Sequence, residues 1–424
     1  MGARTKQSAA ASAFARELSL EHCEEASHLW LLRGKAARSP RYDLAGLLEM
    51  DNRLEAHVDA LRMQAPKSGG LCLEVLRGNR AEEYFPASVL AFESADEALI
   101  RTVVEKASAE PGLSEGVIWA LGWLPYERSG PHIGRLLASG SPHERYIGIA
   151  SSALHRRDPG HFLDDALYSG DVRLMACGLR VVGEMGGRTD RMTPARLRDH
   201  FTDADDESRF WAARSAALLG DADAVGILKP FVEPNSPFRE KALHLAMRLM
   251  DGAAARAWQK DLAATPSTPR LAIIGAGIAG DPELVPWLIE RMNDPVLARV
   301  AAEAAATITG VDIVREGLEG KRPKSFKTGP SDNPRDDNVA LDPDEGLPWP
   351  DAQSMTAWWD RNKGQLPPGM RYLAGRPIAA ETLPHILRTG RQPQRAAAAL
   401  EMAILEPGRP LFDVCAPAFR QDCA

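Results

Sequence analysis

Arginine recurs at one position in a series of helix-like segments, and its guanidinium group is the main chemical feature of this sequence. The arginines are Arg145, Arg173, Arg209, Arg239, Arg270 and Arg299. Glu115 stands in the same register ahead of them, and the intervals average about 31 residues. Guanidinium groups can bind a partner's carboxylates or phosphates through paired hydrogen bonds. They can also pair with an acidic or amide side chain of the preceding turn or a neighbouring repeat.

We interpret most of this arginine column as a structural ladder, because three of its members follow a candidate partner by six residues. The candidate partners are Asp203, Glu233 and Asn293. The ladder comprises Arg145, Arg209, Arg239, Arg270 and Arg299. Pairing of this kind would hold neighbouring repeats together.

A second group of side chains is the candidate partner-binding groove. Trp211 stands between Arg209 and Arg214, so an aromatic ring and guanidinium groups share one segment. The groove candidates are Arg173, Arg180, Trp211 and Arg214. If they formed a basic concave stripe, the surface would suit DNA, whereas a mixed or acidic surface would not.

Other candidate sites have structural interpretations. His155 and His161 flank Asp158 and could ligate a metal, but Asp158 before Pro159 is typical of a helix start. Gly275–Gly280 matches GxGxxG inside an apolar helical segment, so we interpret its glycines as positions of tight helix packing. The sequence contains no GxSxG, Walker A or zincin motif. We therefore predict no catalytic, cofactor or metal site.

The segment 269–312 shows which elements carry the arginines. Two breaks, Gly280-Asp281-Pro282 and Asn293-Asp294-Pro295, divide it into three short helices. The residue three positions after most column arginines is small, as close helix packing requires. Two short antiparallel helices cannot bury both apolar faces alone, so such hairpins are stable only in an array. The pattern predicts an all-α fold, an α-solenoid of HEAT-like helical hairpins.

We expect five regions along the chain. Residues 1–18 are rich in Ala and Ser and are predicted to be disordered, and 19–93 form an N-terminal helical cap. The HEAT-like array covers 94–312. Residues 313–352 are an irregular, acidic and Pro-rich insertion whose proline-flanked tryptophan suits docking onto the array. A C-terminal repeat and cap, 353–424, completes the chain.

Composition indicates an ordinary globular protein. The 424 residues are 44% hydrophobic and 26% charged, with a formal net charge of −7, which disfavours general nucleic-acid binding. The five cysteines are scattered without a CxxC pair, which fits a reducing cytoplasm. The N-terminus lacks the apolar core of a secretory signal, and no apolar run approaches the ~18 residues of a membrane span. We therefore expect a cytoplasmic protein without membrane contact.

Several stretches are more specific than a repeat period. They include ALGWLP at 120–125, RFWAARSAALLGD at 209–221, GDPELVPWLIERM at 280–292, DPDEGLPWPD at 342–351 and RYLAGRP at 371–377. These stretches resemble an uncharacterised family of bacterial HEAT-like repeat proteins often encoded near type VI secretion genes. The resemblance extends over nearly the whole chain, and it implies a genomic context rather than a chemistry.

Two classes of function agree with these features. The first is a non-enzymatic protein-interaction scaffold, namely an adaptor, chaperone or immunity partner that binds a secretion component or effector. The second is a HEAT-like DNA-binding or base-excision protein, which would need the basic stripe described above. We favour the first, because repeat arrays bind partners along an extended surface and the net charge is negative.

Overall fold

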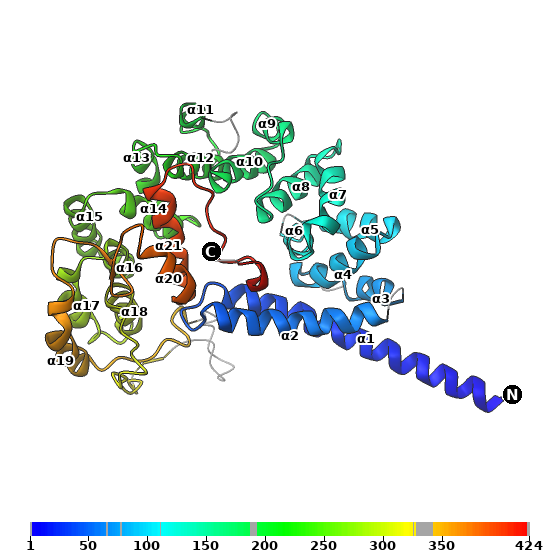
Figure 1. The fold of residues 1–424 in the computed structure, drawn as a ribbon, viewed down its shortest axis with the longest axis horizontal. Coiled ribbons are helices and arrows are strands. Elements are labelled where there is room, and N and C mark those ends of the chain that lie inside the picture. Colours follow the sequence, from blue (N-terminus) through cyan, green and yellow to red (C-terminus); the bar gives the residue numbers. More distant parts are fainter. Residues whose placement is uncertain are drawn as a thin grey trace. The chain divides into compact units, whose positions relative to one another are not determined.

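The computed structural model describes residues 2–64, 67–76, 79–110, 112–186, 193–324, 326–327 and 342–421. These residues form helices α1 to α21, short 3-10 turns and one two-stranded sheet (Figure 1), so the all-α prediction is confirmed. The chain divides into two compact units. Unit 1 contains the described residues up to Leu219 and those from Gly408 onward, and unit 2 is Gly220–Pro407. The predicted regions 94–312 and 353–424 are therefore each divided between the units.

Unit 1 is built mainly from two layers of helices (Figure 1). Layer A consists of α4 (Ala81–Ser94), α6 (Ser114–Trp123), α8 (Pro142–Leu154), α10 (Val172–Met185) and α12 (Asp206–Leu218), each packed on the next. Layer B consists of α5 (Glu97–Ala107), α7 (Tyr126–Leu137), α9 (His161–Leu167) and α11 (Pro194–Arg198). Each layer B helix packs on between one and three layer A helices, so that the apolar face of every hairpin is covered by its neighbours.

The N-terminal end of unit 1 is formed by α1 (Gly2–Ala36), α2 (Leu44–Met63) and α3 (Lys67–Val75). The predicted disordered segment 1–18 differs from the structure, in which α1 begins at Gly2. The scattered cysteines suggested a reducing compartment, in which thiols stay unpaired, and the structure differs from this as well. Cys23 of α1 and Cys72 of α3 form a disulfide with their Cα atoms 5.9 Å apart. This pairing depends on the packing of α1 against α3, which sequence spacing does not reveal.

The disulfide gives a direct prediction. Cys23 and Cys72 are bonded, so reduction should raise the number of thiols that react with Ellman's reagent in the denatured protein by two. Cys72→Ser should lower the free energy of unfolding by about 2–4 kcal/mol, because the bond closes a long loop in the unfolded chain. Cys177→Ser, which changes a free cysteine, is the control. Five thiols before reduction would contradict the bond.

A C-terminal segment, residues 408–421, lies across unit 1, and we call it the strap. Its main chain binds the last carbonyl groups of two layer A helices: Gly408 N donates to Leu218 O at 3.3 Å, and Leu411 N donates to Glu184 O at 3.0 Å. Carbonyl groups at helix C-termini have no partner within their own helix. The strap supplies those partners from a distant part of the sequence.

The far end of the strap is held by a buried ion pair between α1 and α2. Arg33 Nε donates to Asp51 Oδ1 at 2.8 Å, and the two residues are 3% and 1% exposed. Arg33 also donates to the carbonyl oxygens of Cys415 and Ala416, while Asp51 Oδ2 accepts from the main-chain N–H of Ala418. The charged pair therefore binds the strap as well as joining the two helices.

Unit 2 repeats the layered arrangement. Its first layer is α14 (Arg239–Leu249), α16 (Pro269–Ala279) and α18 (Ala298–Thr309), and α15 (Gly252–Ala264) and α17 (Val285–Arg291) cover it. The remaining helices are α13 (Ala224–Leu228), α19 (Ala352–Asn362), α20 (Leu383–Thr389) and α21 (Gln392–Leu405). Strand β1 (Tyr372–Leu373) pairs antiparallel with β2 (Arg376–Pro377). This hairpin caps the C-terminal ends of α16 and α18. Tyr372 N donates to Gly280 O, and Ala374 N donates to Thr307 O, both at 2.7 Å.

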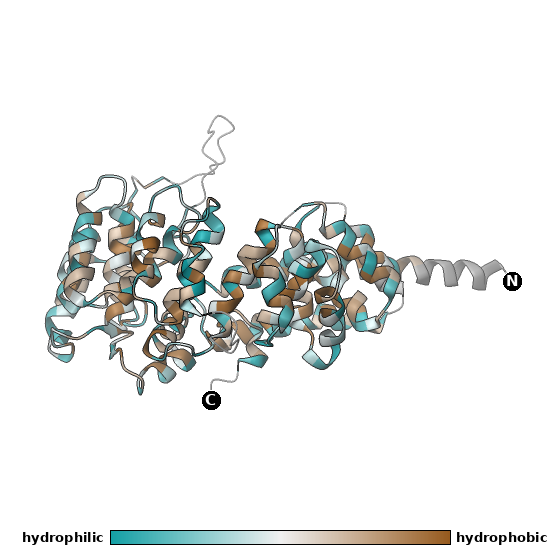
Figure 2. Ribbon diagram, turned by 90° about the horizontal axis from the view of Figure 1, so that it is seen from above, coloured by the Kyte–Doolittle hydropathy of each residue, from teal (hydrophilic) through white to brown (hydrophobic). Residues whose placement is uncertain are grey.

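The predicted small-residue packing is present in both units. The residues three positions after the column arginines are all buried: Gly148, Ala176, Ala212, Ala242, Ile273 and Ala302. Gly277 of the GxGxxG stretch lies against Ala304 of α18, and Gly280 ends α16 with φ +69°. The interpretation of these glycines as packing and capping positions is confirmed. In both units the apolar residues lie on the helices, and the connecting loops are largely polar (Figure 2).

Gly183 of α10 is a critical position in this packing. A Cβ atom there would lie 2.5 Å from Ser215 Oγ and 2.7 Å from Ser215 Cα, so α10 and α12 would have to separate. We expect Gly183→Ala to lower the free energy of unfolding by about 1–3 kcal/mol in urea denaturation. Gly134→Ala on α7 is the matched control. A Cβ at that helical glycine meets nothing within 4 Å, and the change should stabilise the protein slightly.

Candidate binding face on unit 1

The groove candidates predicted from the sequence lie on neighbouring helices of layer A. On α10 the residues Arg173, Cys177, Arg180 and Glu184 follow helical spacing and share one face. Gly178 marks the side of α10 that faces layer B, because a Cβ atom there would contact Ala166 and Leu167 of α9. Arg180 lies about 160° around the helix axis from Gly178. This side of α10 therefore points away from layer B. Glu207, Trp211 and Arg214 share one face of α12 in the same way.

We call this surface the arginine face. It consists of Tyr146, Arg173, Arg180, Glu184, Glu207, Trp211 and Arg214. Trp211 and the three arginines were predicted from the sequence, but Tyr146 and the two glutamates were not. Glu184 stands eleven residues after Arg173, and Glu207 stands four before Trp211. Helical spacing from the predicted residues would have found both glutamates.

Aromatic rings organise the guanidinium groups of this face. The Arg180 and Arg214 guanidinium carbons lie 5.8 and 5.4 Å from the centroid of the Trp211 ring. The Arg173 guanidinium carbon lies 3.9 Å from the centroid of the Tyr146 ring. Trp211 is only 9% exposed, and its Nε1 donates to Glu207 Oε1 at 3.2 Å. Its ring thus supports the arginines and is not an open platform for stacking a nucleic-acid base.

The guanidinium groups of the arginine face are incompletely satisfied. Arg180 Nε and Arg214 Nη1 are buried and have no hydrogen-bond partner among the described residues. Burial lowers the pKa of Arg214, repulsion from Arg180 lowers it further, and Glu184 opposes both effects. Glu184 Oε1 lies 3.7 Å from Arg180 Nε, and its Oε2 lies 3.8 Å from Arg156 Nη1. One carboxylate is therefore shared between two arginines at distances longer than a hydrogen bond.

A reactive thiol and a metal centre are two groups by which such a face could do chemistry. Cys177 lies on the same side of α10, but burial raises the pKa of its thiol to about 11, so the thiol stays protonated at neutral pH. Among the residues that the structure describes, no three His, Cys, Asp or Glu side chains are grouped as a metal site requires. His155 instead binds main chain and the strap. The guanidinium groups of the arginine face are suited to binding an anion.

The ladder arginines have partners that differ from those expected. Arg209 Nη1 donates to the main-chain oxygen of Asp203 at 2.6 Å and pairs with the Asp206 side chain. Arg239 donates to the main-chain oxygen of Pro234. Arg145 has a buried Nε without a hydrogen-bond partner in the described part of the chain. Arg209 thus reaches the expected residue through its main-chain oxygen, and Arg239 reaches Pro234 one residue after the expected Glu233, because local spacing places residues along a helix but does not orient their side chains.

In unit 2 the ladder partners come from the insertion. Arg270 donates with two nitrogens to the Asp344 carboxylate, one bond being 2.9 Å, and Arg299 Nη2 donates to both oxygens of Asp342 at 2.8 Å. Arg299 also lies 4.5 Å from the centroid of the Trp349 ring. Gly320 N donates to Trp349 O at 2.7 Å. The described residues 342–350 are thus docked on α16 and α18, as the proline-flanked tryptophan suggested.

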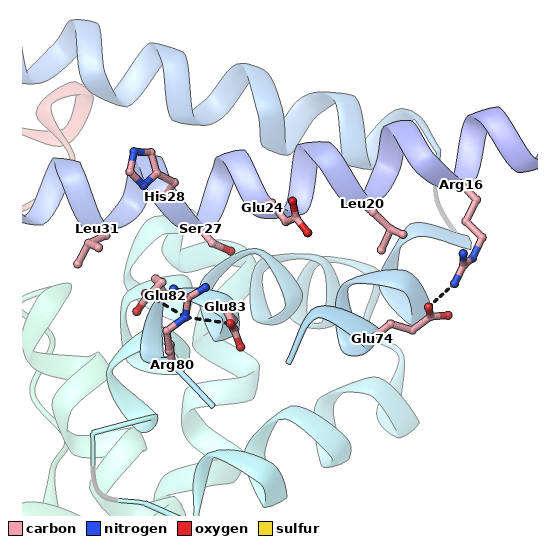
Figure 3. Close-up of a pocket in the computed structure, with 10 residues that line it drawn as sticks. All are labelled: Arg16, Leu20, Glu24, Ser27, His28, Leu31, Glu74, Arg80, Glu82 and Glu83. Atoms are coloured by element: carbon pink, nitrogen blue, oxygen red, sulfur yellow. Dashed lines mark hydrogen bonds and ion pairs between the residues drawn. The ribbon is translucent and has the colours of Figure 1, made fainter. Parts of the chain in front are cut away.

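A pocket of about 560 Å³ lies between α1, α3 and the start of α4 (Figure 3). Its lining includes two arginines and four glutamates. Arg16 pairs with Glu74, while Arg80 Nε lies 3.1 Å from Glu83 Oε1 and 3.6 Å from Glu82 Oε1. The cations of this pocket are therefore paired with its own acids.

A second pocket of about 570 Å³ lies between the strap and the ends of α6 to α8. His155 forms part of its wall. Its Nε2 donates to Leu121 O and its Nδ1 accepts from Arg420 Nη1, both at 2.9 Å. Burial lowers the pKa of His155 to about 4, which keeps the imidazole neutral and able to accept from Arg420.

His155 predicts a pH dependence of stability. Its pKa is lower in the folded than in the unfolded state, so its contribution is complete above about pH 6.5 and is lost as the pH falls toward about 4. The expected loss is roughly 1–2 kcal/mol, reduced by solvent screening. His155→Gln can keep both hydrogen bonds without titrating, so its melting temperature should fall less between pH 7 and pH 4. The exposed His161→Gln is the control, and identical pH profiles for the wild type and His155→Gln would contradict the prediction.

No protein-family model, curated protein or solved structure matches this chain. Among the described residues, no helix is both long enough and apolar enough to cross a membrane.

Proposed function

We propose that this protein is a non-enzymatic protein-interaction scaffold, an α-solenoid of HEAT-like hairpins whose arginine face binds a protein partner. The layered helices of each unit support this proposal, because successive hairpins in both units pack on one another. Stacked hairpins present a row of equivalent helix faces to a partner. The arginine face is such a surface, and its side chains come from three successive layer A helices.

The observation that carries the proposal is that Arg180 Nε and Arg214 Nη1 are buried and have no hydrogen-bond acceptor among the residues that the structure describes. Burying a charged group without hydrogen bonds is costly, and the group normally has a partner. An anionic partner would supply the missing acceptors and offset the repulsion between the guanidinium groups. Residues that destabilise the free protein in this way are typical of binding surfaces.

A role as an adaptor, chaperone or immunity partner in a type VI secretion cluster is proposed only from the resemblance of the sequence. The partner would then be a secretion component or effector. A cytoplasmic location is part of the same proposal. The Cys23–Cys72 disulfide is more typical of an oxidising compartment, so thiol trapping in living cells is the appropriate check of location.

The DNA-binding or base-excision alternative has less support. Glu184 and Glu207 lie among the arginines, so the face is mixed in charge. Trp211 is too buried to stack on a base. We therefore rank a protein partner above a nucleic acid.

Photo-crosslinking tests the scaffold proposal. A photoreactive amino acid replaces Val172, which is 48% exposed beside Arg173, or Tyr168, which is 72% exposed after α9. We expect position 172 to capture a defined partner in the native host and position 168 not to do so. Adding Arg180→Gln and Arg214→Gln should abolish the capture. Equal capture at both positions, or capture that the arginine substitutions leave intact, would contradict binding at the arginine face.

A further inference from the structure

Unit 2 contains an example of how paired arginines of this fold bind a peptide segment. Arg270 and Arg299 stand on the neighbouring helices α16 and α18, and their carboxylate partners are Asp344 and Asp342. The two acids are separated by one residue, Pro343. Two guanidinium groups on adjacent helices thus bind an acid-x-acid segment supplied by the same chain.

The arginine face of unit 1 has a matching pair of cations. Arg180 and Arg214 also stand on neighbouring helices, and both lie against the Trp211 ring at 5.8 and 5.4 Å from its centroid. Their guanidinium carbons are therefore no more than about 11 Å apart. In an extended peptide, side chains at i and i+2 point to the same side and start about 6.6 Å apart. Two carboxylates at this spacing can reach both arginines.

The electrostatics of the face favour an added carboxylate pair. The Glu184 carboxylate lies 3.7 Å from Arg180 and 3.8 Å from Arg156. Glu207 accepts a hydrogen bond from Trp211 Nε1. In the described part of the chain, Arg180 Nε and Arg214 Nη1 have no hydrogen-bond acceptor. A planar carboxylate is the group that matches the guanidinium fork in shape and charge.

We propose that the arginine face binds an extended acid-x-acid segment of a partner protein, with one carboxylate on Arg180 and the other on Arg214. This inference rests on the proposed scaffold function and specifies the chemistry of its partner. Arg173, held against Tyr146, extends the cationic surface toward the start of α10. The Asp342-Pro343-Asp344 segment of unit 2 is the structural template for the ligand.

The probe is a fluorescein-labelled peptide with the sequence of residues 340–351, added to the intact protein and followed by fluorescence anisotropy. Its control carries Asn in place of Asp342 and Asp344. We expect the Asp peptide to bind at least about tenfold more tightly than the Asn peptide, because charged hydrogen bonds are lost in the control. Binding should weaken as salt is added. Equal binding of the two peptides would overturn the proposal.

Substitutions in the protein locate the binding. Arg180→Gln with Arg214→Gln should weaken binding of the Asp peptide at least about tenfold, whereas Arg135→Gln, on an exposed arginine of α7, should leave it unchanged. A conservative variant, Arg180→Lys with Arg214→Lys, should fall between them, because lysine keeps the charge but loses the forked geometry. Unchanged melting temperatures confirm that the variants fold. Undiminished binding by the Gln variant would show exchange with the unit 2 segment and overturn the assignment to unit 1.

Two further outcomes separate this inference from the scaffold proposal. If position 172 captures a protein partner but the Asp peptide does not bind, the scaffold proposal stands and the acid-x-acid ligand is wrong. If a short duplex DNA displaces the peptide and binds more tightly, the partner is a nucleic acid and both proposals fail.

Discussion

Replacement of Asp51 by alanine should lower the free energy of unfolding of unit 1 by about 3–5 kcal/mol. Asp51 and Arg33 are 1% and 3% exposed, so the substitution leaves a buried guanidinium without its carboxylate. The substitution also removes the acceptor for the main-chain N–H of Ala418, which anchors the strap. We therefore expect both a lower urea midpoint and faster hydrogen exchange in residues 408–421.

An exposed ion pair provides the control for Asp51. Glu97 of α5 pairs with Arg135 of α7, but the two side chains are 62% and 55% exposed. Glu97→Ala should change stability by less than about 1 kcal/mol, because water screens the pair. If Asp51→Ala is equally mild, or leaves the strap fully protected, the buried pair does not hold the strap.

Replacement of Glu401 by alanine should cost about 3–5 kcal/mol in unit 2. Glu401 of α21 is 2% exposed, and its Oε1 lies 3.3 Å from Arg248 Nε and 2.6 Å from Arg371 Nη2. Burial already lowers the pKa of Arg248 to about 10, against the opposing effect of Glu401. Without the carboxylate, the buried Arg248 and the partly exposed Arg371 would face each other, and α21 would lose its ion pair with α14. Urea denaturation followed by circular dichroism measures the loss.

A second variant separates the loss of a charge partner from the loss of packing. Replacing both members of the buried pair, with Arg248→Met and Glu401→Leu, removes the charges and keeps most of the volume. Such replacements are often neutral or stabilising. We expect the double variant to be more stable than Glu401→Ala. A double variant as unstable as Glu401→Ala would show that the geometry of the pair, rather than an uncompensated charge, is what the fold requires.

Within the segment 269–312 the sequence alone was sufficient for the helices and the breaks between them. The stop at Gly280-Asp281-Pro282 is present as predicted, since Gly280 adopts positive φ and the Asp281 side chain accepts from Glu283 N. The small residues behind the arginine column are buried because close helix packing selects them. Helical spacing also brought Arg173 and Arg180 onto one face of α10, and Trp211 and Arg214 onto one face of α12. These features depend on residues within a few turns of one another.

Only the tertiary structure decided which distant segment contacts each helix face. The partners of Arg270 and Arg299 come from residues 342–344, and the partners of Arg33 include the strap, far along the chain. The Cys23–Cys72 bond and the division of the array at Leu219 are likewise set by packing between distant elements. Helical periodicity reports which side of a helix is buried, because burial repeats with every turn. It carries no information about which distant segment does the burying, so the arginines could be placed from the sequence but their partners could not.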